Sequence, residues 1–291
     1  MGMKNLLGLG VRKLAASLTA AALSVVLAGC GETAANYDVS AIGPKIHVGV
    51  ATDEPGLGFV QSGQYTGLDV EVARYIVHEL GFVPSEIVWH SVEPSNRESM
   101  LTDGTVDMIV GSYSITAERQ SQVDFAGPYF EAGQDLLVRK AGKHINRVED
   151  LGSERVCTAQ GSTSASVIRQ HDPQVQVDER ERIAVCITAL LSGQADAVSA
   201  DDIALSGLSK VSGGGQLAVV GAPFSVEKYG VAVRHGQPTL VAQINDALEA
   251  MIKDGSWERA VKDAARSIDF KLSPSQLRPP ALDGSLSQAQ R

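Results

Sequence analysis

The sequence has no excess of basic residues. Its 291 residues include 25 lysines and arginines against 34 aspartates and glutamates, which gives a formal net charge of −9 at pH 7. Nucleic acids and anionic membrane surfaces bind basic protein faces, so this negative net charge argues against a nucleic-acid partner. It says nothing about the fold or about enzymatic activity. The charge of a small ligand stays open, because a pocket can differ in charge from the whole protein.

Long hydrophobic runs are missing after the first thirty residues. The run 14–28 is too short to span a membrane comfortably and follows Lys4, Arg12 and Lys13, a pattern typical of an export signal. The absence of a later run argues against the extracytoplasmic domain of a sensor kinase or channel, which would need a second membrane segment.

The export signal ends in Leu27-Ala28-Gly29-Cys30, which resembles a bacterial lipobox. This resemblance implies a signal peptide 1–29, a diacylglycerol and palmitate anchor on Cys30, and a location on the extracytoplasmic face of the cell membrane. The small and polar residues of 30–43 predict a tether. An ordinary secretory peptide and an uncleaved anchor are the alternatives.

Metal-ligating residues are also scarce. The chain has three cysteines and six scattered histidines, with no cluster of the two, so we expect neither a metal site nor another cofactor.

Strands and helices alternate along the chain, which predicts a mainly parallel α/β architecture. Apolar residues at 46, 48 and 50 indicate a strand with one buried face, and Val70, Ala73, Ile76, Val77 and Leu80 have helical spacing. The Pro-, Ser- and Gln-rich segment 273–291 predicts a disordered tail. Further strands are predicted at 86–89, 107–110, 155–158, 196–198 and 229–233, and helices at 97–102, 163–170, 183–191 and 238–253 and from Trp257. The apolar run 135–138 suits a crossover between two parts of the chain, and the strand 229–233 suits a crossover back.

The segment 111–129, GSYSITAERQSQVDFAGPY, follows one of these strands. Ligands of open α/β sheets bind beyond the carboxyl ends of strands, and here that position offers the hydroxyls of Ser112 and Ser114 and the cation of Arg119. A guanidinium can bind both oxygens of a carboxylate at once. The segment therefore suits a small carboxylate, although a solvated surface arginine is the alternative.

This segment resembles the signature of the bacterial extracellular solute-binding proteins of family 3, the polar amino-acid receptors of ABC importers. The resemblance covers about 45–268. It implies a two-lobed periplasmic-binding-protein-like fold of type II, whose two hinge crossovers allow closure on a ligand. The implied parts are lobe 1 at 44–130 and 229–272 and lobe 2 at 131–228.

The same resemblance implies how the first lobe would hold an amino acid. Arg119 would bind the α-carboxylate together with Ser114, and the carbonyl of Ser112 would accept from the α-ammonium. Thr116 is expected to cap the short helix that carries Arg119.

In the second lobe, Ser162 and Thr163 would bind the α-carboxylate at a helix start, where free N–H groups favour anions; plain helix capping is the alternative. Asp201 would pair with the α-ammonium, with Asp202 as the competing candidate, and Tyr229 would offer its hydroxyl near the second hinge.

Arg97 occupies the place where acidic amino-acid binders of the family carry an arginine for the distal carboxylate, which points to glutamate or aspartate, or their amides. A surface pair with Glu93 or Glu98 is the alternative. The loop 53–59 resembles the first-lobe loop of glutamate binders, with Phe59 as its only aromatic residue.

With Cys30 assigned to lipid, Cys157 and Cys186 remain as one pair in an exported protein, where disulfides are stable. Some glutamate-binding members of the family have cysteines at these places. A bridge is expected to stabilise the protein by roughly 3 kcal/mol; two buried free thiols are the alternative.

The sequence therefore predicts a monomeric, lipid-anchored substrate-binding lipoprotein that takes up an amino acid and meets the permease subunits of an ABC transporter. A sensor that reports the ligand to a membrane signalling partner would use the same closure. An exported enzyme resembling cyclohexadienyl dehydratase is a further alternative, with Glu54 or His90 as acid or base. We expect no catalytic residue and no enzymatic activity.

Overall fold

The computed structural model of the protein describes residues 42–282. The expected export signal, Cys30 and most of the tether lie outside the described residues, as does 283–291. No helix within 42–282 combines the length and the apolar character needed to cross a membrane.

The first lobe is built on a mixed five-stranded sheet in the order β4-β1-β5-β12-β6. β1 is parallel to both of its neighbours, whereas β12 is antiparallel to β5 and β6. The strands are β1 (Ile46–Val50), β4 (Ile87–Ser91), β5 (Met108–Ile109), β6 (Val123–Ala132) and β12 (Glu227–Arg234).

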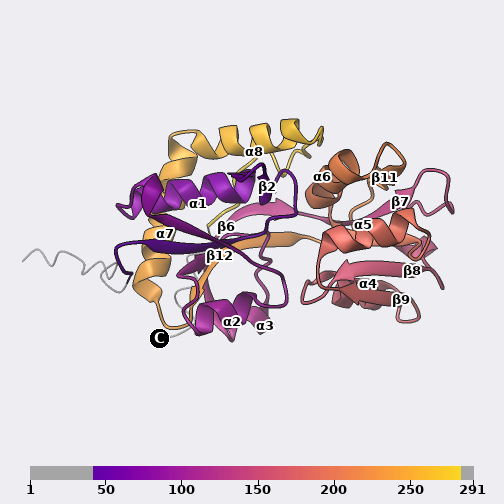
Figure 1. Cartoon of the computed structure of the whole chain (residues 1–291), viewed down its shortest axis with the longest axis horizontal. Coiled ribbons are helices and arrows are strands. Elements are labelled where there is room, and N and C mark those ends of the chain that lie inside the picture. The colour runs from indigo at the N-terminus through magenta and orange to yellow at the C-terminus, as the bar shows by residue number, and fades with distance from the viewer. Residues whose placement is uncertain (1–41, 283–291) are drawn as a thin grey trace, which may run out of the picture. The chain divides into compact units, whose positions relative to one another are not determined.

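Helices cover both faces of this sheet, because neighbouring strand residues point to opposite sides. Met108 joins the core beneath the helices α1, α7 and α8, whereas Ile109 joins a second core beneath α2. In Figure 1, α1 and α8 lie above β6 and β12, and α2 and α3 lie below them. The helices are α1 (Leu68–Glu79), α2 (Arg97–Thr102), α3 (Ala117–Gln120), α7 (Pro238–Lys253) and α8 (Ser256–Ser267).

The second lobe has its own five-stranded sheet in the order β11-β7-β10-β8-β9. Its two faces are again separately packed: Leu137 contacts the core under α5 and α6, and Leu136 contacts the core under α4. The elements are β7 (Gln134–Arg139), β8 (Arg155–Ala159), β9 (Gln176–Arg180), β10 (Ala197–Asp201), β11 (Leu217–Val219), α4 (Ser164–His171), α5 (Ile183–Leu191) and α6 (Asp202–Ser212).

A disulfide joins Cys157 on β8 to Cys186 on α5, with their Cα atoms 5.5 Å apart. Both residues are fully buried. The predicted pairing is confirmed, and the bridge fixes α5 on the sheet of the second lobe.

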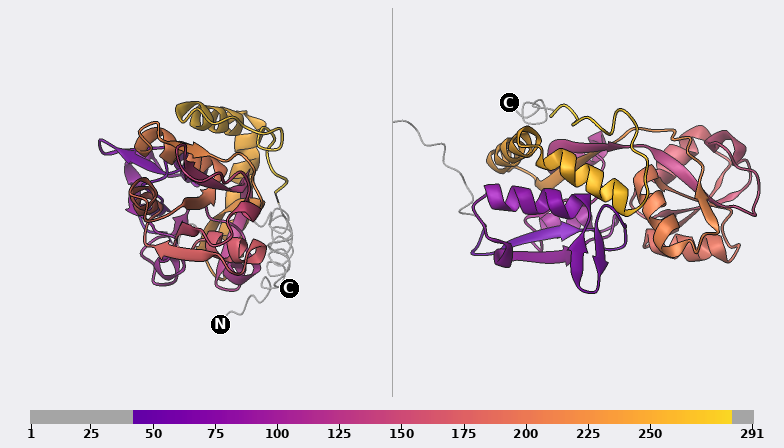
Figure 2. Two further views of the ribbon diagram at one scale, coloured as in Figure 1. Left: turned by 90° about the vertical axis from the view of Figure 1, so that its right-hand side faces the viewer. Right: turned by 90° about the horizontal axis from the view of Figure 1, so that it is seen from above.

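The chain crosses between the lobes twice. Gly133 alone separates β6 from β7, and residues 220–226 return the chain from β11 to β12. Because β6 and β12 are paired over their length, from Glu227 opposite Ala132 to Arg234 opposite Val123, the two crossings lie together, and the lobes form separate groups in Figure 2. The predicted two-lobed α/β fold is confirmed.

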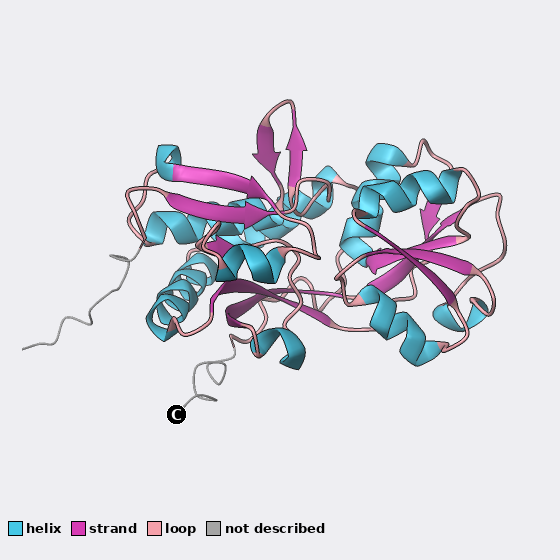
Figure 3. Cartoon of the chain, turned by 60° about the horizontal axis from the view of Figure 1, so that its bottom comes forward, coloured by secondary structure: helices cyan, strands magenta, loops and turns pink. Residues whose placement is uncertain are grey.

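Several details differ from the expected elements. The expected boundaries between 130 and 131 and between 228 and 229 fall inside β6 and β12, and the apolar run 135–138 belongs to the sheet of the second lobe rather than to a crossing. The polar strand β9, the Gly-containing helix α6 and the hairpin of β2 (Phe59–Gln61) and β3 (Gln64–Thr66) are additional elements. The short two-stranded hairpin projects from the first lobe at the top of Figure 3.

The segment 273–282 also differs from the disordered tail that its composition predicts. Gln276 is buried, and its Nε2 donates to Asp202 Oδ2 at 3.1 Å. Leu282 also packs against the core of the first lobe, so the segment is held by contacts with both lobes.

Candidate functional site

A cavity of about 40 Å³ lies between the lobes and collects residues from both. It includes every expected ligand contact except Tyr229. The expected contacts that line it are Arg97, Ser112, Ser114, Arg119, Ser162, Thr163 and Asp201.

Arg119 is the residue at which the two lobes meet. The Thr116 hydroxyl caps α3 by accepting from the Arg119 N–H at 3.2 Å, as expected. Arg119 is 7% exposed, and its guanidinium donates to two carbonyl oxygens, that of Ser114 in its own lobe at 2.8 Å and that of Gly161 in the other lobe at 2.9 Å. Its Nε lies 4.0 Å from Glu98 Oε1, and the remaining guanidinium N–H donors are left for other partners. Burial, and then the charge of Arg97, lower the pKa of Arg119, but an arginine stays protonated.

Tyr113 holds both arginines in place. Its ring centroid lies 4.7 Å from Arg97 Cζ and 4.8 Å from Arg119 Cζ, distances at which a cation is attracted to an aromatic face. The Tyr113 hydroxyl donates to Glu98 at 2.5 Å, and burial raises the pKa of this hydroxyl. This role could not be predicted from the sequence, because it depends on three segments of the chain meeting around one ring.

The loop that carries Ser112 and Ser114 is fixed by its backbone. The Ser112 N–H donates to Asp69 Oδ2 at 3.0 Å, and Asp69 also accepts from the Tyr129 hydroxyl at 2.7 Å. Ser112 has φ of 45°, a strained left-handed conformation for a serine. Ser114 forms an isolated bridge with Tyr229, so the loop is attached to β12.

In the second lobe, the loop before α4 brings Ser162 and Thr163 to the cavity. The Ser162 hydroxyl donates to the carbonyl of Ala159 at 2.6 Å, and the Thr163 hydroxyl donates to Glu227 Oε2 at 3.0 Å. Thr163 precedes α4, but its side chain makes no capping bond. The Thr163 hydroxyl is thus held by Glu227 rather than by a helix N–H, which does not support the capping alternative for Thr163. The Ser162 hydroxyl also accepts from the N–H of Ser164, the first residue of α4, at 3.4 Å, which fits the capping alternative for Ser162.

The two neighbouring aspartates have different surroundings. Asp201 lines the cavity and accepts a short hydrogen bond from the Tyr229 hydroxyl. Burial, and then the charge of Glu227, raise the pKa of Asp201 to about 8. Asp202 instead accepts from the N–H of Ile203 at 2.8 Å and from Gln276. Of the two, Asp201 is the one that a ligand could reach.

Glu54 is a cavity residue that is absent from the expected ligand contacts. Its carboxyl oxygen Oε2 is buried without a hydrogen-bond partner, and the same holds for Nε of Arg97, a residue that is 3% exposed. Burial, and then the charge of Asp53, raise the pKa of Glu54 to about 8. The resemblance to glutamate binders points to the loop 53–59 as a whole. Sequence alone, however, does not show which side chain of that loop points into the cavity.

Two further residues named in the sequence analysis, His90 and Phe59, do not line the cavity. His90 lies on β4 and shares a 2.8 Å hydrogen bond with His47 on β1. Phe59 lies on β2 and lines a different groove. Of the two residues considered as an acid or base, only Glu54 is in the cavity.

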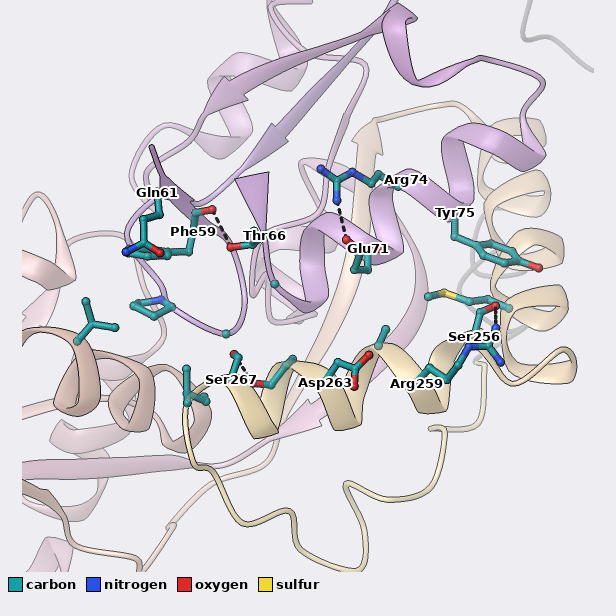
Figure 4. Close-up of a pocket in the computed structure, with 18 residues that line it drawn as sticks. Phe59, Gln61, Thr66, Glu71, Arg74, Tyr75, Ser256, Arg259, Asp263 and Ser267 are labelled. Atoms are coloured by element: carbon teal, nitrogen blue, oxygen red, sulfur yellow. Dashed lines mark hydrogen bonds and ion pairs between the residues drawn. The ribbon is translucent and has the colours of Figure 1, made fainter. Parts of the chain in front are cut away.

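That other groove is larger, with a volume of about 820 Å³. It lies between α1, the β2–β3 hairpin and α8 (Figure 4), and contains none of the expected ligand contacts. Its charged side chains have partners at the surface: Arg74 donates to Glu71 at 2.6 Å, and Arg259 donates to Ser256 at 2.7 Å. The smaller cavity has buried ionisable groups with shifted pKa values and two buried polar atoms without hydrogen-bond partners, which is the chemistry of a binding site.

Close approach of the lobes around the cavity depends on two glycines. A Cβ atom on Gly161 would lie 2.7 Å from Ser95 Cα, and one on Gly207 of α6 would lie 2.0 Å from the carbonyl oxygen of Pro55. On one side of the cavity, Arg182 of the second lobe pairs with Glu93 of the first at 2.5 Å. Among residues 42–282, no group of three or more His, Cys, Asp or Glu side chains could hold a metal ion.

Comparison with known families decides the relationship. The family model described as bacterial extracellular solute-binding proteins, family 3, matches residues 46–264. The chain belongs to this family. Family 3 members are extracytoplasmic proteins, and the match spans both lobes and both crossings.

Named family 3 relatives share most of their length with this chain. The ABC transporter glutamine-binding protein GlnH of Bacillus subtilis is 38% identical over 252 residues, covering 82% of this chain and 91% of the relative. The glutamate-binding protein GluB of Corynebacterium glutamicum is 34% identical over 264 residues, covering 86% and 90%. The solved structure of an ancestral arginine-binding protein bound to arginine is 33% identical, with a TM-score of 0.71, covering 76% of this chain and 97% of that one.

Proposed function

We propose that this protein binds an amino acid between its lobes and delivers it to the permease of an ABC importer. The observation that carries the proposal is the pair of opposite charges on the two sides of one cavity. Arg119 comes from the first lobe and Asp201 from the second. An α-carboxylate and an α-ammonium need such partners before they can leave water.

In this proposal, Arg119 binds the α-carboxylate with help from Ser114, Ser162 and Thr163. Asp201 binds the α-ammonium, together with the carbonyl oxygen of Ser112. The raised pKa of Asp201, about 8, supports this role, because an ammonium beside the carboxylate would offset the cost of burying its charge.

Tyr229 orients Asp201 through its hydroxyl and contacts the ligand only through that carboxylate. Arg97 faces the ligand side chain and selects a polar group at its end. The names of the relatives, a glutamine-binding and a glutamate-binding protein, support glutamine, glutamate or their shorter relatives as ligands. Reversible binding rather than catalysis follows from the same set, since its charges pair with a whole zwitterion.

The cellular setting is part of the proposal. Cleavage before Cys30 and lipidation of its thiol would hold a monomer on the extracytoplasmic face of the cell membrane. Lobe 1 at 44–130 and 229–272 and lobe 2 at 131–228 would close on the ligand, and the permease, or a membrane signalling partner, would recognise the closed form.

A thermal-unfolding screen of the protein from residue 31 against the twenty amino acids tests the proposal. A ligand present at about a hundred times its dissociation constant adds roughly 2.7 kcal/mol to the free energy of unfolding. We expect the largest shifts with glutamine, glutamate, asparagine or aspartate. The absence of a shift with every amino acid would contradict the proposal.

A further inference from the structure

The carboxyl group of Glu54 is a hydrogen-bond acceptor on the wall of the cavity, and the backbone of Glu54 is held in place by hydrogen bonds. Glu54 lies in a tight turn in which its N–H donates to the Gly58 carbonyl at 2.9 Å and its carbonyl accepts from the Leu57 N–H at 3.0 Å. Beyond an interaction with the Ser112 side chain, its buried Oε2 has no partner. A buried oxygen without a donor costs free energy unless something completes it.

Arg97 supplies an unpaired donor at the same cavity. It is the first residue of α2, its guanidinium lies over the Tyr113 ring, and its Nε is buried without a partner. Arg97 and Glu54 interact electrostatically. The cavity thus presents one acceptor and one donor beyond the groups assigned to the α-carboxylate and the α-ammonium.

One donor and one acceptor lining the same cavity match the two polar groups of a primary amide. Resting on the proposed function, we propose that Glu54 sets the choice between a carboxamide and a carboxylate on the ligand side chain through its own proton. Ionised Glu54 accepts from the amide NH₂ of glutamine while Arg97 donates to the amide oxygen. Protonated Glu54 donates, with Arg97, to the carboxylate of glutamate. Where free Glu54 is ionised, glutamate binding therefore takes up one proton at Glu54, and where free Glu54 is protonated, glutamine binding releases that proton to solvent.

The charges around the cavity give this choice its direction. Arg119 and Asp201 are neutralised by the α-carboxylate and the α-ammonium of the ligand. The positive charge of Arg97 and the negative charge of an ionised Glu54 then cancel, and a neutral amide leaves the net charge there at zero. A second carboxylate beside ionised Glu54 would place two like charges in a buried site, which a proton relieves. The titratable groups that interact electrostatically with Glu54 include Asp53, Asp69, Arg97, Tyr129 and Tyr229.

The expected pH dependence follows from these surroundings. Burial raises the pKa of Glu54 to about 8, so glutamate binds a protonated Glu54 below that pH. Above it, the affinity for glutamate falls by up to about tenfold per pH unit, because one proton must be taken up. The affinity for glutamine does not need that proton. Asp201 and the α-groups affect both ligands alike, so they cancel in the ratio of the two dissociation constants.

The test is isothermal titration of the protein from residue 31 with L-glutamate and L-glutamine between pH 6.5 and pH 9. Each titration is repeated in buffers of different ionisation enthalpy, which measures proton uptake directly. We expect the ratio of the glutamate to the glutamine dissociation constant to rise about tenfold or more from pH 7 to pH 9. At pH 8.5 and above, glutamate binding should take up close to one proton and glutamine binding close to none.

Glu54→Gln is the informative variant, because an amide has the shape of the acid but cannot ionise. We expect it to remove the pH dependence of the ratio and to retain glutamate binding at pH 9. Glu249→Gln, an exposed change on α7, makes the same change in net charge away from the cavity and should keep the wild-type profile.

A wild-type ratio that does not change with pH, equal proton uptake for both ligands at pH 8.5, or a Glu54→Gln profile like that of the wild type would each overturn this inference. These results leave amino-acid binding itself intact. If neither ligand nor any other amino acid binds at any pH, the proposed function fails as well. If Glu54→Gln does not fold, the wild-type proton uptake decides.

Discussion

The two lobes contribute different chemistry to one cavity. The first lobe supplies both arginines and Glu54, which are held by tertiary contacts such as the Tyr113 ring between Arg97 and Arg119. The second lobe supplies hydroxyls and Asp201, placed where β8 and β10 end. In the proposed roles, the first lobe contacts both the α-carboxylate, through Arg119, and the ligand side chain, through Arg97 and Glu54. The second lobe contacts only the groups that every amino acid shares.

The largest effect should come from the first lobe's contact with the α-carboxylate. Arg119→Ala is expected to weaken binding of every amino acid by about 2–5 kcal/mol, because it removes one member of a buried charge pair. Isothermal titration measures the loss, and near-ultraviolet circular dichroism verifies that the fold is retained. Binding within threefold of the wild type would refute the assigned role.

The disulfide tests whether the second lobe is stabilised separately from its binding groups. Replacing Cys157 and Cys186 together by serine is expected to lower the free energy of unfolding by about 3 kcal/mol, because the bridge restricts the unfolded chain. Neither cysteine lines the cavity, so affinity at temperatures where the variant is folded should be retained. Chemical denaturation with and without reductant, on variant and wild type, separates the two effects. A large loss of affinity under conditions in which the variant is fully folded would show that the disulfide also supports ligand binding.

The adjacent aspartates offer a matched pair within the second lobe. Asp201→Asn is expected to weaken amino-acid binding by about 2 kcal/mol, roughly 30-fold, because the α-ammonium loses its charged partner. Asp202→Asn should leave affinity almost unchanged and lower stability, since Asp202 accepts from the Ile203 N–H and from Gln276. Titration and thermal unfolding of both variants provide the comparison. The reverse pattern would show that the wrong aspartate had been assigned to the ligand.

The smallest expected effect concerns the approach of one lobe to the other. Gly207→Ala should favour α6 by up to about 1 kcal/mol through helix propensity. It should nevertheless weaken binding by about tenfold, because the new Cβ would clash with the Pro55 carbonyl oxygen. Ser206→Ala is the control on the same helix. A more stable variant with unchanged affinity would show that this close approach is not needed.

Much of the fold could be predicted because the elements repeat a clear pattern. The spacing of Val70, Ala73, Ile76 and Val77 predicts α1, and all four residues are buried. The strand β9 escaped prediction because its sequence QVDER is mostly exposed and polar. The helix α6 contains Gly207, which lowers helix propensity but allows contact with the loop at Pro55.

The residues of the candidate site also fall into those that could be predicted from the sequence and those that could not. Arg97, Arg119 and Asp201 lie in segments with a recognisable motif, and the cavity contains all three. Glu54 and Tyr113 act through partners that are distant in sequence, so neither motif nor periodicity could assign their roles. Buried groups without partners, which only a structure reveals, identified the wall formed by Glu54 and Arg97.

The most direct test of the central claim is calorimetric titration with ligands that lack one α-group. L-Glutamate and L-glutamine are compared with 4-aminobutanoate, which lacks the α-carboxylate, and with glutarate, which lacks the α-ammonium. We predict that only the intact amino acids bind, with each incomplete ligand weakened by at least about 2 kcal/mol through the unpaired charge left on Arg119 or Asp201. Glutarate or 4-aminobutanoate binding as tightly as glutamate would contradict the account.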